Sequence, residues 1–123
     1  MLSSMTPTIV VKDDNVFMVT GSPGGRTIIN TVLQTIVNVV DFDMNAQEAV
    51  DAGRMHHQWL PDRIAVERYA MSPDTKKILR QLGHDVVEVT RQGAAQVIVV
   101  DPETNMLNGG NDRRVPDGAA VGF

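Results

Sequence analysis

The feature that most constrains the fold is an apolar stripe near the end of the first third of the chain. Apolar residues recur at three- and four-residue intervals between positions 26 and 41: Ile28, Ile29, Val32, Leu33, Ile36, Val37 and Val40. This spacing predicts a helix over residues 26–41 that packs on a core. Because many of these residues are β-branched, packing rather than helix propensity must stabilise it.

The segments around this helix predict further strands and helices. Residues 9–11 and 16–19 form apolar runs around an Asp-Asp-Asn turn, which indicates a hairpin. A second helix is expected after Asn45, with Glu48 completing a capping box, and a third between Ser72 and Gly83. Further strands are expected at 63–68, 85–90, 95–100 and near 105–107. The pattern predicts an α+β fold with helices on one side of a mostly antiparallel sheet.

The composition narrows the class of protein. A chain of 123 residues predicts a single domain over 1–123. The net charge of −4 and the lack of a basic stripe argue against a nucleic-acid partner. The chain has no cysteine, which excludes disulfides and thiolate metal sites. No apolar stretch is as long as a membrane span, so no membrane contact is expected.

A glycine-rich loop, GSPGG at residues 21–25, lies between the second strand and the first helix. Such a loop is often only a tight turn, and on the pattern alone this is the favoured interpretation. The alternative is that its backbone N–H groups bind a phosphate or a developing oxyanion. The loop matches neither the dinucleotide-binding pattern nor the P-loop pattern, and no cofactor is predicted.

Other candidate residues have weaker patterns. Ser3 and Ser4 are adjacent hydroxyls before a strand, and a nucleophilic role would need a base that the sequence does not identify. His56 and His57 are adjacent, so in an extended segment they point apart and cannot easily share a metal ion. We expect them to pack and hydrogen-bond around Trp59. The acidic residues are scattered and form no evident carboxylate pair, so no metal site is predicted.

Taken together, these segments resemble one family. LSSMTPTIVVKDD (residues 2–14), GSPGGRTIINTVLQTIVNVVDF (residues 21–42) and AGRMHHQWLPDRIAVE (residues 52–67) are similar to the small subunit of γ-glutamyltranspeptidase, also called glutathione hydrolase. The last residues resemble the end of that subunit, with Arg113 in place of the family's proline. The resemblance covers essentially the whole chain, as the C-terminal portion of a small subunit. It implies part of the αββα sandwich of N-terminal-nucleophile hydrolases.

The resemblance also implies roles for particular residues. Ser3 and Ser4 match the serines that bind the glutamyl α-carboxylate, and Gly24 and Gly25 match the pair whose N–H groups form the oxyanion hole. This reverses the tight-turn interpretation of the loop. The family's nucleophile is a threonine upstream of the two serines, so no nucleophile is expected within this chain.

The partners follow from the same resemblance. They are γ-glutamyl compounds such as glutathione, the large subunit, and the upstream part of the small subunit. By itself the chain is expected to be inactive and to form a homodimer that covers apolar sheet surface. The alternative is a catalytically dead structural or γ-glutamyl-binding module derived from the family. Family members are typically periplasmic or extracellular.

Overall fold

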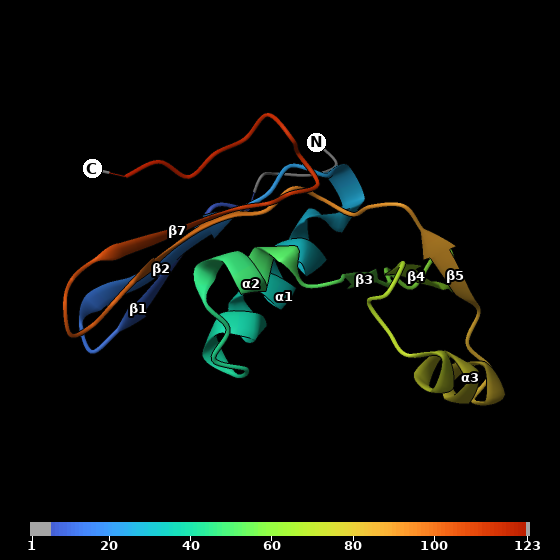
Figure 1. Ribbon diagram of the computed structural model, residues 1–123. Helices are drawn as coiled ribbons and strands as arrows, with labels where there is room; N and C mark the ends of the chain where they lie inside the picture. The colour runs from blue at the N-terminus through green and yellow to red at the C-terminus, as the bar shows by residue number, and fades with distance from the viewer. Residues whose placement is uncertain (1–5, 123) are drawn as a thin grey trace. The chain divides into compact units, whose positions relative to one another are not determined.

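The computed structural model describes residues 6–122, so Ser3 and Ser4 lie outside the described residues. The chain divides into two compact units. Unit 1 combines residues 1–52 with residues 93–123, and unit 2 is the intervening Gly53–Gln92 (Figure 1). The expectation of a single domain over residues 1–123 stays a prediction.

Unit 1 is built on a four-stranded antiparallel sheet. Its strands, in the spatial order β1-β2-β6-β7, are Thr8–Lys12, Asn15–Gly21, Gln96–Val100 and Leu107–Asn111. The hairpin of β1 and β2 is the predicted one, and β2 then pairs with β6 across a large separation in sequence. The last strand begins two residues later than expected near 105–107, because Asp101–Asn105 forms the turn before it.

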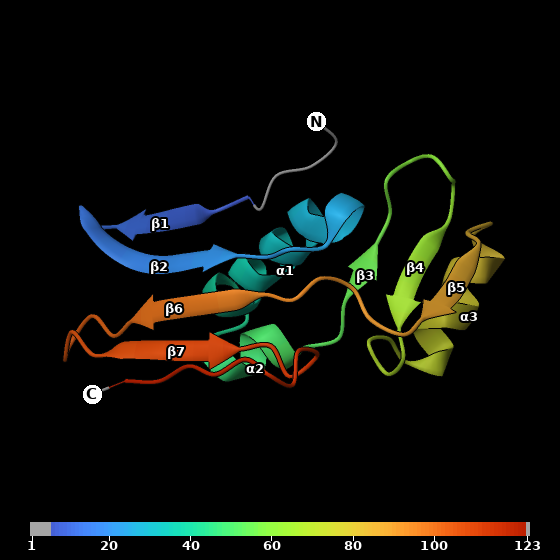
Figure 2. The same cartoon turned by 90° about the horizontal axis from the view of Figure 1, so that it is seen from above.

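Helices cover one face of this sheet. The short helix η1 (Gly25–Thr27) leads into α1 (Ile28–Val40), and α2 (Ala46–Asp51) follows. Figure 2 shows α1 beneath β2 and α2 beneath β7. The core between helices and sheet consists of small and medium apolar side chains: Met18, Val39, Ala46, Ala49, Val50, Ala95 and Val97. The predicted helix over 26–41 is therefore confirmed, with a 3-10 turn as its first three residues.

The second predicted helix is also confirmed, together with its capping box. The backbone N–H of Glu48 donates to Asn45 Oδ1 at 2.9 Å, and Asn45 N–H donates to Glu48 Oε2 at 3.0 Å. These two bonds satisfy backbone donors at the start of α2 that have no partner within the helix.

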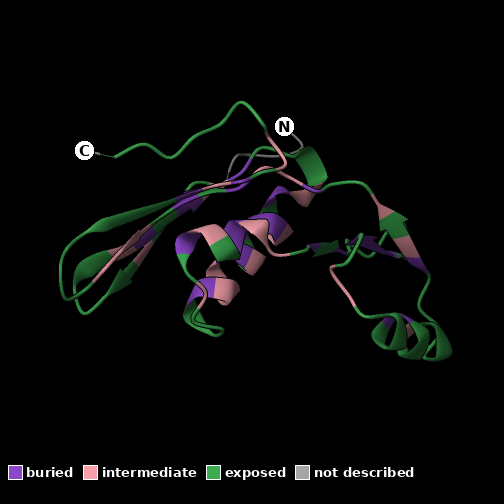
Figure 3. Cartoon of the chain, viewed as in Figure 1, coloured by how far each residue is buried: buried purple, intermediate pink, exposed green. Residues whose placement is uncertain are grey.

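The opposite face of the sheet in unit 1 carries exposed apolar side chains. Val10, Met18 and Val97 point toward the helices, so their neighbours Ile9, Val19 and Ile98 point away from them. We call this second surface the outer face. Figure 3 shows long exposed stretches along β1 and β7. Unit 1 thus has one helix-covered face and one open apolar face.

Unit 2 is a small three-stranded sheet with one helix. The strands β3 (Met55–His56), β4 (Ile64–Glu67) and β5 (Val86–Val89) lie in that order, and α3 (Pro73–Gln81) connects the last two. Strands β4 and β5 are parallel, as a helical crossover requires. Strand β3 lies outside the strands expected from the sequence, and its pairing with β4 spans only two residues. The α+β class with mostly antiparallel pairing is confirmed.

None of the helices within residues 6–122 is long and apolar enough to cross a membrane.

Candidate functional site: the glycine loop of unit 1

The glycine loop connects the end of β2 to η1 with a backbone that only glycine adopts easily. Gly24 has a φ of +144° and Gly25 a φ of +59°. Side chains with a Cβ disfavour positive φ, so both positions call for glycine on conformational grounds. The loop thereby turns the chain sharply from the strand into the first turn of helix.

The two glycines differ in what surrounds them. A Cβ added at Gly24 would lie 2.9 Å from the Cα of Gly93 and 2.9 Å from Thr27 Oγ1, so this position is closely packed. A Cβ added at Gly25 would meet no atom within 4 Å. Gly24 is therefore held by its neighbours, whereas Gly25 borders open space that a ligand can occupy.

The backbone N–H groups of the two loop glycines are not used within the described part of the fold. The Gly24 carbonyl accepts hydrogen bonds from Thr27 N–H (3.3 Å) and Thr27 Oγ1 (3.0 Å). Because C=O and N–H point in opposite directions across a trans peptide, the Gly25 N–H points away from Thr27. Within residues 6–122, neither Gly24 nor Gly25 uses its N–H as a donor. The loop thus presents two unpaired backbone donors, which suits an anion.

A second segment, residues 93–94, packs behind the loop. Ser22 is buried, and its Oγ accepts from the Ala94 N–H at 3.0 Å while donating to the Pro23 carbonyl at 2.6 Å. Gly93 has a φ of +66°, and a Cβ there would lie 2.7 Å from Thr31 Oγ1. These contacts fix the position of the glycine loop relative to α1.

A buried carboxylate holds this backing segment in turn. Asp112 is fully buried, and its Oδ2 accepts from the Ala95 N–H at 2.8 Å. Its Oδ1 accepts from both the backbone N–H and Nη1 of Arg114, each at 3.0 Å. Arg114 also donates to the carbonyls of Val50 and Ala52 at the end of α2. No local pattern in the sequence indicates this brace, because the partners of Asp112 and Arg114 come from distant segments.

The histidines lie in unit 2 and do not gather around one point. His56 Nε2 bonds Gln58 Oε1 at 2.8 Å, whereas His57 Nε2 lies 3.1 Å from Asp62 Oδ1. His57 Nδ1 accepts from the Trp59 N–H at 3.2 Å, as expected, but the Trp59 side chain is 76% exposed. The expected packing around Trp59 is therefore wrong. No three potential ligands among His, Cys, Asp and Glu form a metal-binding group within residues 6–122.

Unit 2 has its own buried polar cluster. The Glu67 carboxylate accepts from the backbone N–H groups of Arg54 (3.0 Å) and Gln92 (2.6 Å). Arg54 Nη1 donates to the Gln92 carbonyl at 2.7 Å, and Gln92 Nε2 donates back to the Arg54 carbonyl at 3.2 Å. These three residues come from the beginning, the middle and the end of unit 2, so their hydrogen bonds link the two ends of the unit to its centre. Most of its polar groups are used in hydrogen bonds between segments, which favours a structural role, although Gln92 Oε1 is buried without a hydrogen-bond partner in the described residues.

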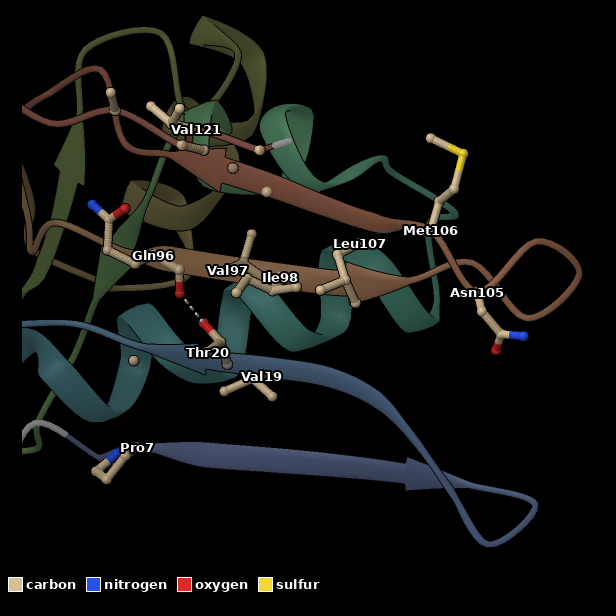
Figure 4. A pocket seen from close by; sticks show the side chains of 16 residues that line it. Pro7, Val19, Thr20, Gln96, Val97, Ile98, Asn105, Met106, Leu107 and Val121 are labelled. Carbon is tan, nitrogen blue, oxygen red and sulfur yellow. Dashed lines mark hydrogen bonds between the residues drawn. The ribbon is translucent and has the colours of Figure 1, made fainter.

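A cavity lies on the outer face of unit 1, apart from the glycine loop. It has a volume of about 900 Å³ and is lined by β2, β6, β7 and the segment from Ala119 to Gly122. Figure 4 shows Val19, Ile98, Leu107 and Val121 around it, with Thr20 Oγ1 bonded to the Gln96 carbonyl. Neither Gly24 nor Gly25 contributes to the lining. This cavity is therefore a feature of the outer face of the sheet and not of the glycine loop.

Comparison with known proteins identifies the family of these elements. The family model described as gamma-glutamyltranspeptidase matches residues 1–122. The glutathione hydrolase proenzyme of Escherichia coli is 49% identical over 122 residues, which is 99% of this chain and 21% of that protein. The glutathione hydrolase proenzyme of Pseudomonas sp. is 42% identical over 130 residues, covering 99% of this chain and 23% of that protein.

Solved structures agree with the sequence relatives. The T380A mutant of the Helicobacter pylori gamma-glutamyltranspeptidase superposes with a TM-score of 0.88 at 47% identity, covering 93% of this chain and 62% of that chain. The fold of the described residues is therefore that of the N-terminal-nucleophile hydrolases. The chain spans about a fifth of the length of the two relatives and somewhat less than two thirds of the solved chain.

Proposed function

Because this chain belongs to the γ-glutamyltranspeptidase family, we propose that it is part of an enzyme that hydrolyses or transfers the γ-glutamyl group of glutathione and related compounds. The observation that carries the proposal is the glycine loop. It presents two unpaired N–H donors at the start of a helix, next to the open space at Gly25, an arrangement that can stabilise an oxyanion.

In this proposal, Gly24 and Gly25 form the oxyanion hole. A threonine hydroxyl, supplied by polypeptide outside these 123 residues, attacks the γ-glutamyl carbonyl carbon and transfers its proton to a base. The carbonyl oxygen becomes negatively charged and accepts hydrogen bonds from the two N–H groups. Collapse of this intermediate expels the amine, which takes up a proton, and leaves an acyl-enzyme. Water or an acceptor amine then attacks the acyl carbon and releases the threonine.

Ser3 and Ser4 are proposed to bind the α-carboxylate of the glutamyl group. Their hydroxyls can donate charge-assisted hydrogen bonds to a carboxylate. They precede β1, which pairs with β2, and β2 leads directly into the glycine loop. In this proposal the chain supplies two parts of the γ-glutamyl pocket. The two serines come just before the N-terminal hairpin in the sequence, and the glycine loop directly follows it.

The chain alone is expected to be inactive, since the proposed nucleophile and the large subunit are separate from it. The direct experiment assays a chromogenic γ-glutamyl anilide with the isolated chain. A matched sample adds the remaining part of the Escherichia coli relative. Turnover is expected only in the combined sample, and replacing both serines by alanine should raise its KM. Turnover by the isolated chain that disappears in the double-serine variant would contradict the proposal and favour a serine nucleophile.

Binding distinguishes the alternative of a γ-glutamyl-binding module. An incomplete pocket lacks groups that hold the substrate, so its affinity for glutamate should be no better than about millimolar, or about −4 kcal/mol. Calorimetric titration of glutamate into the isolated chain measures this directly. Micromolar affinity would support the binding module instead.

We also propose that the isolated chain dimerises through the outer face of unit 1. Exposed apolar side chains there include Ile9, Val19, Ile98 and Leu107. A contiguous apolar surface of this kind favours association. Sedimentation velocity should detect a dimer, and Ile98→Asp should dissociate it. Ile78→Asp, which changes an exposed isoleucine on α3, is the matched control; equal loss of the dimer in both variants, or a monomeric parent chain, would contradict this surface.

A further inference from the structure

Helix α1 carries a second apolar surface, which the packing within unit 1 does not explain. Ile29, Leu33, Ile36 and Val40 recur at intervals of four, three and four residues. Ile29, Leu33 and Val40 are 68%, 56% and 50% exposed, and Ile36 is half-buried at the edge of the core. We call these four residues the free flank of α1. Their spacing is that of a helix–helix contact seam.

The free flank lies on the side of α1 that faces away from α2. The helix buries Ile28, Val32, Thr35 and Val39 against the sheet. Its polar residues Asn30, Gln34 and Asn38 lie on the other side, where Asn38 Nδ2 donates to the Ala49 carbonyl of α2 at 3.2 Å. At 100° per residue, the free flank and this polar side are separated by more than a third of a turn. Helix α1 is therefore apolar on two sides and contains no charged residue, a pattern typical of a helix with neighbours on both sides.

No helix within the described residues of unit 1 lies beside the free flank. Figure 2 shows α1 beneath β2 and α2 beneath β7, with no helix beneath β1. On β1, Val10 shares the helix-facing side with Met18, and both Val10 and Ile36 pack at the margin of the core. We call the margin between α1 and the helix-facing side of β1, with Val10 and Ile36 at its edge, the apolar corner. A further helix alongside α1 would bury both the free flank and the helix-facing side of β1.

We propose that this corner docks an amphipathic helix from the part of the enzyme outside these 123 residues, alongside α1 and over β1. The proposal rests on the proposed function, in which the chain acts within a longer enzyme. The relatives supply the necessary length, since this chain spans only 21% of the Escherichia coli protein. A helix fits this position better than a strand, because the neighbouring elements in the layer, α1 and α2, are helices.

The charges at the two ends of α1 set the orientation of the docked helix. Arg26 is exposed at the N-terminal end, and Asp41 and Asp43 are exposed just beyond the C-terminal end. The partial negative charge of the α1 C-terminus adds to these two carboxylates. The docked helix therefore has basic residues near Asp41 and Asp43 and an acidic residue near Arg26. Its apolar residues recur at three- and four-residue intervals.

The test co-expresses this chain with the remainder of the Escherichia coli relative and places a photo-crosslinking amino acid at position 33. Cross-linked peptides are identified by mass spectrometry. We expect cross-links to a helical segment of the remainder with the stated apolar spacing. Cross-links to a second copy of this chain, cross-links to an extended segment, or no cross-links at all would each overturn the proposal.

Two charge variants on the same helix make the test independent of folding. Leu33→Asp changes the free flank, and Gln34→Asp adds the same charge on the polar side. Circular dichroism of the isolated variants checks that both fold. Leu33→Asp should weaken association with the remainder at least tenfold, and Gln34→Asp should change it less than threefold; equal effects would overturn the docking site. Association and cross-linking report on docking, whereas the γ-glutamyl anilide assay reports on the proposed function, so the two can fail separately.

Discussion

Both units contain buried polar clusters, but unit 1 and unit 2 differ in the size of their apolar cores. Unit 1 has an apolar core of seven buried residues between its sheet and two helices. Unit 2 has only three buried residues in its apolar cluster, Ile64, Val66 and Val86, and it closes on the hydrogen bonds of Glu67. A small unit buries too little apolar surface to be stable by packing alone. Buried polar groups therefore take a larger share of the stability in unit 2, and the glycine loop lies in the unit with the stronger apolar core.

The largest expected effect tests the core of unit 1. Met18 is fully buried on β2, so Met18→Ala leaves a cavity and should destabilise unit 1 by about 2–5 kcal/mol. Hydrogen exchange should accelerate for amides of β2 and β6 and change little for those of β4. Equal acceleration in both units would mean that they unfold together and would remove the contrast between them.

The next effect tests the polar cluster of unit 2. Glu67→Gln keeps the shape of the side chain but turns an amide N–H₂ toward a backbone donor. One buried N–H then loses its acceptor, which costs about 1–3 kcal/mol. Exchange should accelerate in β4 and β5. Glu103→Gln, at an exposed position in unit 1, is the matched control and should change stability by less than about 0.5 kcal/mol.

The helix caps provide a matched pair with one member in each unit. Asn45 caps α2 in unit 1, and Ser72 Oγ accepts from the Thr75 N–H at 3.1 Å at the start of α3 in unit 2. Substituting either by alanine should cost about 1 kcal/mol. Thermal unfolding of the two variants measures this. A much larger loss of stability for Ser72→Ala than for Asn45→Ala would show that unit 2 depends more on its helix cap than unit 1 does.

The smallest effect depends on pH. A hydrogen bond from Lys76 Nζ at 2.7 Å lowers the pKa of Glu88 below its ordinary value of 4.5. A carboxyl with a lowered pKa contributes stability above its unfolded-state pKa and loses it as the pH falls through the folded-state pKa. Glu88→Gln should therefore destabilise unit 2 slightly at pH 7, and the difference should shrink below pH 4.5 and vanish once the pH is below the lowered folded-state pKa. A difference that persists unchanged at pH 3 would contradict this pairing.

The elements predicted from sequence are those specified by neighbouring residues. The stripe of α1, the capping box at Asn45 and the cap at Ser72 each depend on residues within a few positions, and all are confirmed. Strand β3 was missed because its two residues are defined by pairing with β4 rather than by a pattern of their own.

The parts of the candidate site that escaped prediction depend on contacts between distant segments. Gly24 and Gly25 stand out in the sequence, but Gly93 does not, since its constraint comes from Ser22 and Thr31 some 60 or more positions earlier. Asp112 and Glu67 look like ordinary surface acids in the sequence. Their burial follows from backbone donors at Ala95 and Gln92, which only the folded chain brings to them.

The assignment of the glycine loop is tested most directly by a matched pair of glycine substitutions in a complete enzyme. Gly25 and Gly83 both have positive φ, +59° and +97°, and a Cβ added at either meets no atom within 4 Å. Valine at each position introduces strain at positive φ, and at least as much at Gly83, whose φ lies farther outside the left-handed region. The host is the Escherichia coli relative with its matching segment replaced by this chain.

In that host, kcat for a γ-glutamyl anilide should fall by about 10²–10³ for Gly25→Val, because the added side chain enters the space beside the N–H donors and displaces the oxyanion from them, with a loss like that of a removed oxyanion donor. Gly83→Val should shift the unfolding temperature at least as much as Gly25→Val does, while leaving kcat within about threefold of the parent. Equal losses of kcat in the two variants, or full activity in Gly25→Val, would contradict the assignment of the glycine loop as the oxyanion hole.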